Sequence, residues 1–408
     1  MNILYIAYSC SPYGGSEEAI GWNIPLAMSK DHNVFVVTKI EQKEAIDDYC
    51  SKNQVNIKFT YVDIKKVYKK IFKGALYSGR LNVWLKASYD IVKKICDTND
   101  IDIIHQINPV EFRSVGEYYK FNNVKYVAGP LGGGEYIPSQ LNKYLSIKDK
   151  FIEFVRLKQN QKAIRRYKKS NLFSRIDCVM FANSETENYL VNNGIDIKNS
   201  IIATEVGIKE DSIDYLQEIK NIDETVFISV GRLVYRKGHK LLLDAFSRLE
   251  PSLSYKLYIV GGGPELDSLV DYANKKGLGD KVIFCGKIPY ANISEEYKKA
   301  DVFVLPSLRE TTGTVVMEAL ANGLPIVAAK AYGTNTILDE ETGYLYDIDG
   351  DKDEIVEALK RQLELCIKDK ALLMTKSKRC VELVQNNTWN TKKEFYETIY
   401  TGIMDEIS

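Results

Sequence analysis

The sequence predicts an α/β protein made of two doubly wound, Rossmann-like domains. Its 408 residues exceed the ~250 to 300 residues at which a single hydrophobic core usually stops growing. Short apolar runs alternate with helical patterns along almost the whole chain, which is typical of buried parallel strands in βα units. A polar, acidic stretch at residues 209–224 separates two such series of strands, so we expect a domain boundary there.

The first series predicts an N-terminal domain over residues 1–214. Its strands are expected at the runs NILYIAYS, VFVVTK, NIKFTYVD, IDIIHQIN, KYVAGP, CVMFANS and SIIATEVG. These runs are apolar without strict alternation, which favours strands that are covered by helices on both faces of one sheet.

The second series predicts a C-terminal domain over residues 215–387. Its strands are expected at TVFISVG, KLYIVG, KVIFCG, DVFVLPS and LPIVAA. Residues 388–408 carry aromatic side chains at helical spacing, with Trp389, Tyr396 and Tyr400 among them. This pattern predicts a terminal helix that packs back toward the N-terminal domain.

Composition narrows the class of protein. Lys plus Arg and Asp plus Glu both number 55, which argues against a nucleic-acid binder that depends on bulk basicity. The seven Cys are scattered, without paired spacing, so a reducing cytoplasm fits best. The start lacks a basic signal-peptide segment, and no apolar run reaches the ~18 residues of a membrane span. We therefore expect a cytoplasmic protein whose membrane contact is peripheral.

The first strand ends in the motif SPYGGSEEAIGW. Gly14 and Gly15 allow a tight turn, and Ser16 can cap the helix that follows. The motif is not GxGxxG, and the second strand ends in Thr38 and Lys39 rather than in an acidic residue, which argues against an NAD-dependent dehydrogenase. An ordinary strand-to-helix turn is the alternative.

Two cations follow the first strand of the second domain, in ISVGRLVYRKGHKLLLDAF. Gly231 ends the strand, Arg232 follows it, and Lys237 stands just before the next helix. Cations at a strand end and close to a helix N-terminus suit a doubly charged phosphate. Solvated surface cations are the alternative.

The segment LPSLRETTGTVVMEALANGLPIVAA places two carboxylates around a helix start. Glu310 is expected on the loop, and Glu318 just over one turn into the helix that begins near Thr314. The amides of residues 311–315 would lie at the helix N-terminus, where they can hold phosphate oxygens, and Glu318 could accept hydrogen bonds from sugar hydroxyls. Unrelated surface carboxylates are the alternative.

Five motifs in order resemble the donor-binding half of retaining GT-B glycosyltransferases of the GT4 family, the glycosyl transferases group 1. They are VGRLVYRKG, IVGGGPE, VIFCGKIPY, ADVFVLPS and LRETTGTVVMEALANGLPIVA, over about residues 225–345. SPYGGSEEAIGW and GPLGGGE extend the resemblance toward transferases that build bacterial surface polysaccharides. The resemblance implies a GT-B fold. It also implies transfer of a hexose-type sugar, with retention, from a UDP-sugar or GDP-sugar to a hydroxyl of a lipid-linked or polysaccharide acceptor in cell-surface glycan biosynthesis.

The same resemblance implies roles for single residues. Arg232 and Lys237 would neutralise the donor diphosphate, and Glu310 would lie beside the transferred sugar, so these three are the expected catalytic residues. Further donor-binding residues would be Gly15 over the diphosphate, Gly231 at the strand end, Ile288 at the base, the amides of Gly313, Thr314 and Val315, and Glu318 on the ribose. His105 and Glu135 would lie on the acceptor side.

No metal and no cofactor are expected, because such transferases typically neutralise the diphosphate with cations. The acidic string at residues 100–102 lies beside a strand and is interpreted as an ordinary turn.

Two basic stretches at residues 65–80 and 148–169 carry interleaved aromatic and aliphatic residues. The second holds nine cations and two acids. Amphipathic basic helices bind anionic surfaces, so we expect an anionic membrane surface as a partner, at the inner face of the cell membrane. Solvated outer helices are the alternative, and no nucleic-acid recognition fold accompanies these stretches.

Two other functions stay open. A non-hydrolysing nucleotide-sugar epimerase could use the same fold, but its acid/base carboxylates and His cluster are not visible in the sequence. A non-catalytic scaffold that binds nucleotide sugars or a membrane is the alternative outside enzymes.

Overall fold

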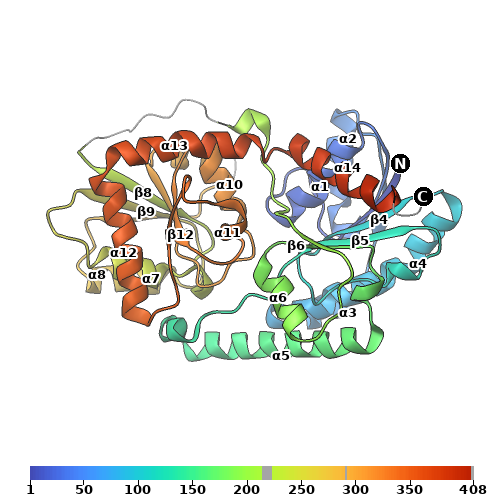
Figure 1. Cartoon of the computed structure of the whole chain (residues 1–408), viewed down its shortest axis with the longest axis horizontal. Coiled ribbons are helices and arrows are strands. Elements are labelled where there is room, and N and C mark those ends of the chain that lie inside the picture. The colour runs from blue at the N-terminus through green and yellow to red at the C-terminus, as the bar shows by residue number, and fades with distance from the viewer. Residues whose placement is uncertain (214–222, 290–291, 406–408) are drawn as a thin grey trace. The chain divides into compact units, whose positions relative to one another are not determined.

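A computed structural model describes residues 1–213, 223–289 and 292–405 of the chain. The chain divides into two compact units. Unit 1 comprises Met1–Glu135, Phe151–Gly207 and Trp389–Ser408, and unit 2 comprises Tyr136–Lys150 and Ile208–Thr388. Each unit has its own parallel sheet with helices on its faces (Figure 1), which confirms the predicted fold class.

The sheet of unit 1 has seven parallel strands in the order β3-β2-β1-β4-β5-β6-β7. The order reverses at β1, where the chain crosses from one half of the sheet to the other, as in doubly wound folds. The strands are β1 (Asn2–Ala7), β2 (Asn33–Lys39), β3 (Ile57–Val62), β4 (Ile103–Asn108), β5 (Lys125–Leu131), β6 (Cys178–Phe181) and β7 (Ser200–Ile202). Each overlaps a run that the sequence predicts as a strand, and β2 and β5 extend one residue beyond theirs.

Helices cover both faces of this sheet. Its helices are α1 (Glu17–Met28), α2 (Lys43–Lys52), α3 (Lys66–Ile71), α4 (Tyr77–Thr98), α5 (Ile147–Ser170), α6 (Ser184–Asn192) and α14 (Trp389–Asp405), with α5 beginning in unit 2. Trp84 of α4 and Ile164 of α5 pack into the core on one face, and Trp22 of α1 and Tyr396 of α14 into the core on the other. The predicted cap on α1 is wrong. Ser16 has a φ of 51° and makes no side-chain cap hydrogen bond, whereas a capping residue is typically extended.

The sheet of unit 2 has six parallel strands in the order β10-β9-β8-β11-β12-β13. They are β8 (Thr225–Val230), β9 (Tyr255–Val260), β10 (Val282–Gly286), β11 (Val302–Leu305), β12 (Ile326–Ala329) and β13 (Gly343–Tyr346). Five of them are the predicted strands. The sixth, β13, has the sequence GYLY and lacks the β-branched residues that mark the other five.

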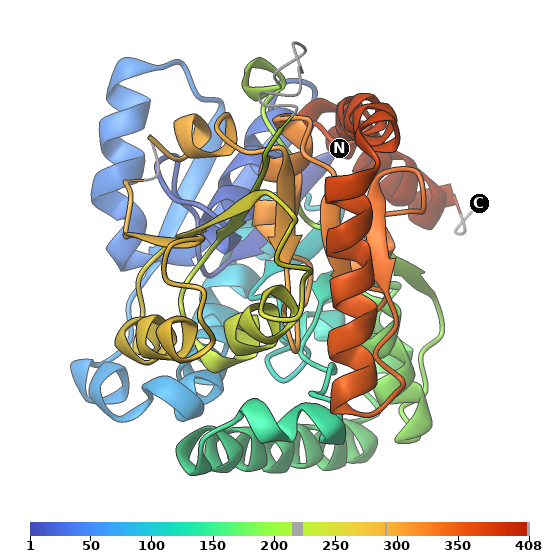
Figure 2. The same cartoon turned by 90° about the vertical axis from the view of Figure 1, so that its left-hand side faces the viewer.

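The helices of unit 2 are α7 (His239–Phe246), α8 (Leu266–Lys275), α9 (Ile293–Tyr297), α10 (Thr314–Ala321), α11 (Thr334–Ile337), α12 (Lys352–Lys368) and α13 (Lys370–Gln385). Figure 2 shows α12 along the sheet, where it contacts α7, β12 and β13. Its apolar face, including Ile355 and Leu359, is fully buried in the core of the unit.

A short segment in the first half of the chain, residues 136–150, belongs to unit 2. Leu141 and Leu145 are buried in the core of unit 2, and the Tyr144 hydroxyl donates to Asp244 Oδ2 at 2.7 Å. The predicted domain bounds do not include this exchange of a segment between the units. The boundary predicted between residues 214 and 215 lies outside the described residues, and the terminal helix α14 belongs to unit 1.

Across residues 1–213, 223–289 and 292–405, no helix combines the length and apolarity that a membrane crossing requires.

Candidate active site

The predicted catalytic residues of unit 2 lie on the loops that follow β8 and β11. These two parallel strands are neighbours in the sheet, so their carboxyl ends meet at one edge. Open α/β sheets bind ligands at that edge. The structure therefore brings Arg232, Lys237 and Glu310 to the part of the unit where a ligand is expected.

Glu310 is the centre of a buried polar cluster. Lys237 Nζ donates a hydrogen bond to Glu310 Oε2, and Ser307 Oγ donates to the same oxygen at 3.0 Å. The Arg236 guanidinium lies 3.7 Å from the other carboxylate oxygen, Oε1. Lys237, Ser307 and Glu310 are all buried, so one carboxylate, one ammonium and one hydroxyl are held together away from bulk water.

The charge state of Glu310 follows from these contacts. Burial by itself raises the pKa of the carboxyl group. Lys237, then Arg236, and the hydrogen bonds from Lys237 and Ser307 more than offset this effect and hold the pKa of Glu310 below its ordinary value. Glu310 is therefore a carboxylate at neutral pH.

Arg232 differs from Lys237. Its side chain is exposed, and within the described residues it makes no ion pair or side-chain hydrogen bond. A free guanidinium at a strand end can give both of its parallel N–H groups to a phosphate. The two predicted diphosphate cations thus start from different states, one unpaired and one bound to a buried carboxylate.

Helix α10 begins at the same loop. Its N-cap, Gly313, has a φ of 88°, and Thr314 and Val315 are its first two residues. Amides in the first turn of a helix have no intrahelical acceptor and attract anions. Glu318 lies about one turn further on, and its Oε2 accepts a hydrogen bond of 2.9 Å from the Tyr297 hydroxyl.

The loops around this cluster touch through backbone atoms. A Cβ at Gly238 would lie 1.9 Å from the carbonyl oxygen of Pro306, and one at Gly333 would lie 1.7 Å from that of Thr311. Real Cβ atoms do not approach so closely, so the loops after β8, β11 and β12 depend on glycine at these contacts. The site is built on a tightly packed strand edge.

Residues 214–378 match the family model described as glycosyl transferases group 1. This segment is similar to glycosyl transferases group 1. The match contains every predicted donor-site residue except Gly15, and it confirms the resemblance that the five motifs indicate.

One curated relative is the alpha-monoglucosyldiacylglycerol synthase of Streptococcus pneumoniae. It is 34% identical over 143 residues, which cover 34% of this chain and 32% of that protein. The chain spans about a third of the length of the curated relatives it matches.

Solved structures resemble the whole chain. Sucrose-phosphate synthase from Thermosynechococcus elongatus aligns over 100% of both chains with a TM-score of 0.69 and 19% identity. Anabaena HepE in complex with UDP and glucose aligns over 98% of this chain and 100% of its own, with a TM-score of 0.63 and 18% identity. These likenesses, together with the two doubly wound sheets, confirm the GT-B fold.

For three further predicted donor-binding residues, the structure gives only their position, backbone conformation or exposure. Gly231 ends β8 with a φ of 153°, beside Arg232 at the strand edge of unit 2. Ile288 is half-buried, two residues after the end of β10, and its neighbours 290 and 291 lie outside the described residues. Gly15 belongs to unit 1 and is exposed. The donor-binding roles of Ile288 and Gly15 stay predictions.

His105 is fully buried in β4 of unit 1. Its Nε2 lies 2.6 Å from the carbonyl oxygen of Gly129, and its Nδ1 lies 2.6 Å from the Tyr400 hydroxyl. The carbonyl can only accept, so Nε2 carries the proton and Nδ1 accepts from Tyr400. Burial lowers the pKa of His105 to about 4, against a smaller opposite effect of the Gly129 carbonyl. The ring is neutral with both nitrogens occupied in the fold of unit 1, and its acceptor-side role stays a prediction.

Glu135 is also fully buried. Its carboxylate accepts hydrogen bonds from the Gly133 amide at 3.1 Å and from Asn183 Nδ2 at 2.7 Å. Thr186 Oγ1 lies 3.3 Å away. These contacts fasten the loop after β5 to the start of α6, so Glu135 has a structural task in unit 1, and an acceptor-side role stays a prediction.

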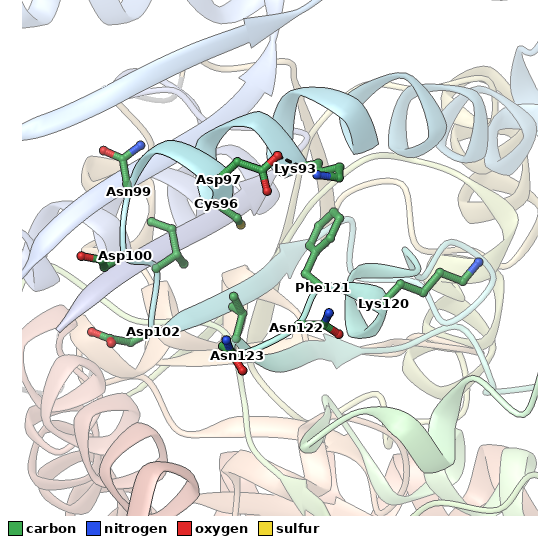
Figure 3. Close-up of a pocket in the computed structure, with 12 residues that line it drawn as sticks. Lys93, Cys96, Asp97, Asn99, Asp100, Asp102, Lys120, Phe121, Asn122 and Asn123 are labelled. Carbon is green, nitrogen blue, oxygen red and sulfur yellow. Dashed lines mark hydrogen bonds and ion pairs between the residues drawn. The ribbon is translucent and has the colours of Figure 1, made fainter.

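Figure 3 shows a pocket of about 410 Å³ in unit 1 that includes the acidic string at residues 100–102. It lies at the end of α4 and before β4 and β5, at the amino ends of the strands. Asp102 Oδ2 accepts from the Asn2 amide at 2.7 Å, and burial raises the pKa of the Cys96 thiol to about 11. The pocket thus lies at the sheet edge opposite the carboxyl ends of the strands, and α/β sheets bind ligands at those carboxyl ends. Its thiol is a poor nucleophile.

Three residues of the candidate site are not among those that the sequence pattern predicts. Ser307 is the last residue of the predicted strand run DVFVLPS, and its place at a strand end was a usable signal. Arg236 is adjacent to Lys237 but was not distinguished from a surface cation. Tyr297 reaches Glu318 from another helix, α9, which no local pattern reveals.

Among the side chains in the described part of the chain, no group of three or more His, Cys, Asp or Glu residues is arranged to hold a metal ion.

Proposed function

We propose that the protein is a retaining glycosyltransferase. It moves a hexose-type sugar from a nucleoside-diphosphate sugar to a hydroxyl of a lipid-linked or polysaccharide acceptor. The observation that carries this proposal is the Lys237–Ser307–Glu310 cluster beside the free Arg232 and the start of α10. This cluster joins a fixed carboxylate to several groups that attract anions, all within the segment that is similar to glycosyl transferases group 1.

The proposed step breaks the bond between the anomeric carbon and the diphosphate oxygen and forms a bond from that carbon to the acceptor oxygen. Negative charge grows on the leaving diphosphate, where Arg232 and the first amides of α10 would stabilise it. Lys237 has three N–H donors and spends one on Glu310, so its other two remain for a phosphate. The acceptor proton passes to the departing phosphate, which removes the need for a separate protein base.

Glu310 would stabilise the positive charge that develops on the sugar as the bond to the diphosphate breaks. Its low pKa keeps it negative at neutral pH, and the contacts with Lys237 and Ser307 fix its position before substrate binds. A preorganised charge of this kind costs no reorganisation at the moment of reaction.

The donor would be a UDP-sugar or a GDP-sugar, with Glu318 on the ribose and the backbone near Ile288 at the base. HepE, a structural neighbour, was solved with UDP and glucose, which supports this donor class. Glu318→Gln should weaken the binding of free UDP or GDP, because a carboxylate accepts two ribose hydroxyls better than an amide does. Calorimetry with the better-binding nucleotide tests this role, with Tyr297→Phe as the control that removes the hydrogen bond to Glu318 and keeps the carboxylate.

The proposed acceptor class rests on the name of the Streptococcus pneumoniae relative, a synthase of a glucosylated diacylglycerol. A lipid-linked acceptor places the reaction at a bilayer, so we place the protein in the cytoplasm, peripheral to the inner face of the cell membrane, in cell-surface glycan biosynthesis. No metal is needed in this proposal, since cations and helix amides neutralise the diphosphate.

The test incubates the full chain with labelled UDP-hexoses and GDP-hexoses together with lipid and polysaccharide fractions. Label in the acceptor fraction, with the anomeric configuration of the donor retained and with activity that survives EDTA, supports the proposal. An isomerised donor without transfer indicates an epimerase. Donor binding with neither reaction indicates a scaffold, and a complete loss with EDTA that magnesium restores contradicts the metal-free mechanism.

A further inference from the structure

Over residues 151–160, helix α5 turns polar side chains inward and apolar side chains outward, whereas its second half packs Ile164 and Tyr167 into the core. Glu153, Arg156 and Asn160 are buried, whereas Phe151 is 65% exposed and Phe154 is 54% exposed. Leu157, one turn further along the helix, is 40% exposed. A helix that packs on a protein core normally shows the opposite arrangement, so its outer face calls for an explanation.

The inward polar residues have a clear task. Arg156 donates to the carbonyl oxygens of Gly133 at 3.0 Å and Glu135 at 2.6 Å, and Asn160 Nδ2 donates to Gly133 at 3.1 Å. They hold the loop after β5. Phe151, Phe154 and Leu157 are not needed for these contacts, because they point away from that loop on the exposed face.

Helix α3 also exposes apolar side chains, and cations surround them. It has no buried residue, and Val67 and Ile71 are 50% and 56% exposed. The sequence from residue 64 to residue 89 contains no acid. Within the described residues, four cations here have no ion-pair partner: Lys65, Lys66, Lys70 and Lys73.

Both helices flank α4 in unit 1. Helix α3 contacts α4, and Arg166 of α5 donates to Asn82 Oδ1 of α4 at 3.2 Å. Figure 1 shows α3 and α5 on the same side of the sheet. We call the exposed residues of α3 and its flanks, residues 65–73, together with those of α5 beyond residue 150, the α3–α5 surface.

The charge on the α5 part is also one-sided. Over residues 151–169 the one acid, Glu153, is buried and paired with Arg156 at 2.9 Å. Five exposed cations on this stretch have no ion-pair partner in the described structure: Lys158, Lys162, Arg165, Lys168 and Lys169. The α3–α5 surface therefore presents nine unpaired cations around a set of exposed apolar side chains.

We propose that the α3–α5 surface docks on an anionic lipid bilayer. Phe151, Phe154, Leu157, Val67 and Ile71 enter the interface between headgroups and acyl chains, and the surrounding cations contact lipid phosphates. Lys and Arg side chains suit this position, because their aliphatic stems lie along the apolar surface while their charges reach the headgroups.

The charge decides between a bilayer and a second copy of the chain. A copy seated on the same surface would bring nine more cations against these nine, and like charges placed together disfavour association. An anionic bilayer complements them. This inference deepens the proposed function by naming the surface that would bring the enzyme to a lipid-linked acceptor, and it rests on that function only for the acceptor.

The test is co-sedimentation of the full chain with two kinds of vesicle, phosphatidylcholine alone and phosphatidylcholine mixed with phosphatidylglycerol, at low and high salt. We expect wild type to prefer the anionic vesicles and to keep a fraction bound at high salt, because apolar insertion is not screened. A quadruple variant, Lys158→Gln, Lys162→Gln, Lys168→Gln and Lys169→Gln, should lose at least about tenfold in partitioning to anionic vesicles at low salt.

Phe151→Ser with Phe154→Ser should instead remove the salt-resistant fraction. The matched control is Leu372→Ser with Met374→Ser, which removes exposed apolar side chains from α13 in unit 2 and should leave binding unchanged. Thermal melting verifies that each variant is folded, and single Phe154→Ser replaces the pair if the double variant is not.

Equal partitioning of wild type into both kinds of vesicle overturns the proposal, as does a Phe variant that binds like wild type. A wild-type dimer that the Phe substitutions dissociate, without vesicle binding, assigns the surface to a second copy and also overturns it. No donor or acceptor is present, so failure of the proposed transfer reaction would not change the result.

Discussion

At the scale of single residues, substitutions of the two predicted diphosphate cations, Arg232 and Lys237, should separate an effect on catalysis from an effect on stability. Arg232 is exposed and unpaired in the described structure, so Arg232→Ala should leave the thermal melting temperature unchanged. It should lower kcat/KM by about a hundredfold or more, equivalent to ~3 kcal/mol of lost transition-state stabilisation. Lys368→Ala, which removes an exposed lysine at the end of α12, away from the strand edge where Arg232 lies, is the control for both measurements.

Lys237→Ala should lower activity and stability together. The substitution leaves the Glu310 carboxylate buried without its ammonium partner, and breaking a buried pair costs about 3 to 5 kcal/mol. Adding Glu310→Gln should recover part of the stability, because it removes the unpaired buried negative charge. It should recover none of the activity. Equal melting temperatures for the Arg232 and Lys237 variants would contradict the buried pair.

At the scale of elements, the site depends on how closely the loops after β8 and β11 approach. Gly238 and Gly277 have nearly the same φ, 69° and 73°, but a Cβ at Gly238 meets the Pro306 carbonyl whereas one at Gly277 meets nothing within 4 Å. Gly277→Ala should therefore cost about 1 kcal/mol, the price of the left-handed conformation. Gly238→Ala should cost at least about 2 kcal/mol more, by chemical denaturation, and should reduce activity because the loops must separate.

A second element, α14, is fixed to the sheet of unit 1 by a buried hydrogen-bond chain. The Tyr400 hydroxyl lies 2.6 Å from His105 Nδ1 and 3.1 Å from the Tyr5 hydroxyl. Tyr400→Phe leaves both partners unsatisfied and should destabilise the protein by about 1 to 3 kcal/mol. Tyr396→Phe is the matched control, because the buried Tyr396 hydroxyl has no hydrogen-bond partner within the described residues, and its loss should cost little. Equal losses in the two variants would rule out the hydrogen-bond chain as the fastening.

The elements also show what local sequence can predict. Strands such as β8 and β11 are uninterrupted apolar runs, so their pattern alone identifies them, and the positions of Arg232, Glu310 and Glu318 follow from the loops next to them. The cap at Ser16 could not be predicted, because its φ of 51° is set by the loop before it. The contacts of His105 with Tyr400 and of Glu318 with Tyr297 join residues 295 and 21 positions apart, beyond the reach of any local pattern.

At the scale of the whole molecule, two separate segments of the chain form unit 2, and Asp244 holds the first of them in place. Its carboxylate accepts from the Tyr144 hydroxyl of the segment 136–150 and from Tyr272, and it lies 2.7 Å from Lys276 Nζ and 3.2 Å from Lys352 Nζ. Burial raises the pKa of Asp244, but these hydrogen bonds more than offset that effect and lower it to about 2. One side chain thus joins Tyr144 to residues about a hundred and two hundred positions further along the chain. These contacts attach the segment 136–150 to unit 2.

This pKa has a definite consequence for stability. In the unfolded chain an Asp side chain has a pKa of about 3.9, so the folded state binds its proton less readily. The resulting stabilisation, about 2 kcal/mol, is complete above pH ~4 and is lost as the pH falls from there toward 2. Asp244→Asn should lower stability at pH 7 and flatten the acid limb of the stability curve, measured by urea unfolding between pH 2 and 7. A protease digest at pH 7 should also cut the variant sooner within residues 136–150. Glu250→Gln, which removes an exposed carboxylate paired with Lys368, is the control, and an acid limb that is as steep in Asp244→Asn as in wild type would show that Asp244 does not carry this pH dependence.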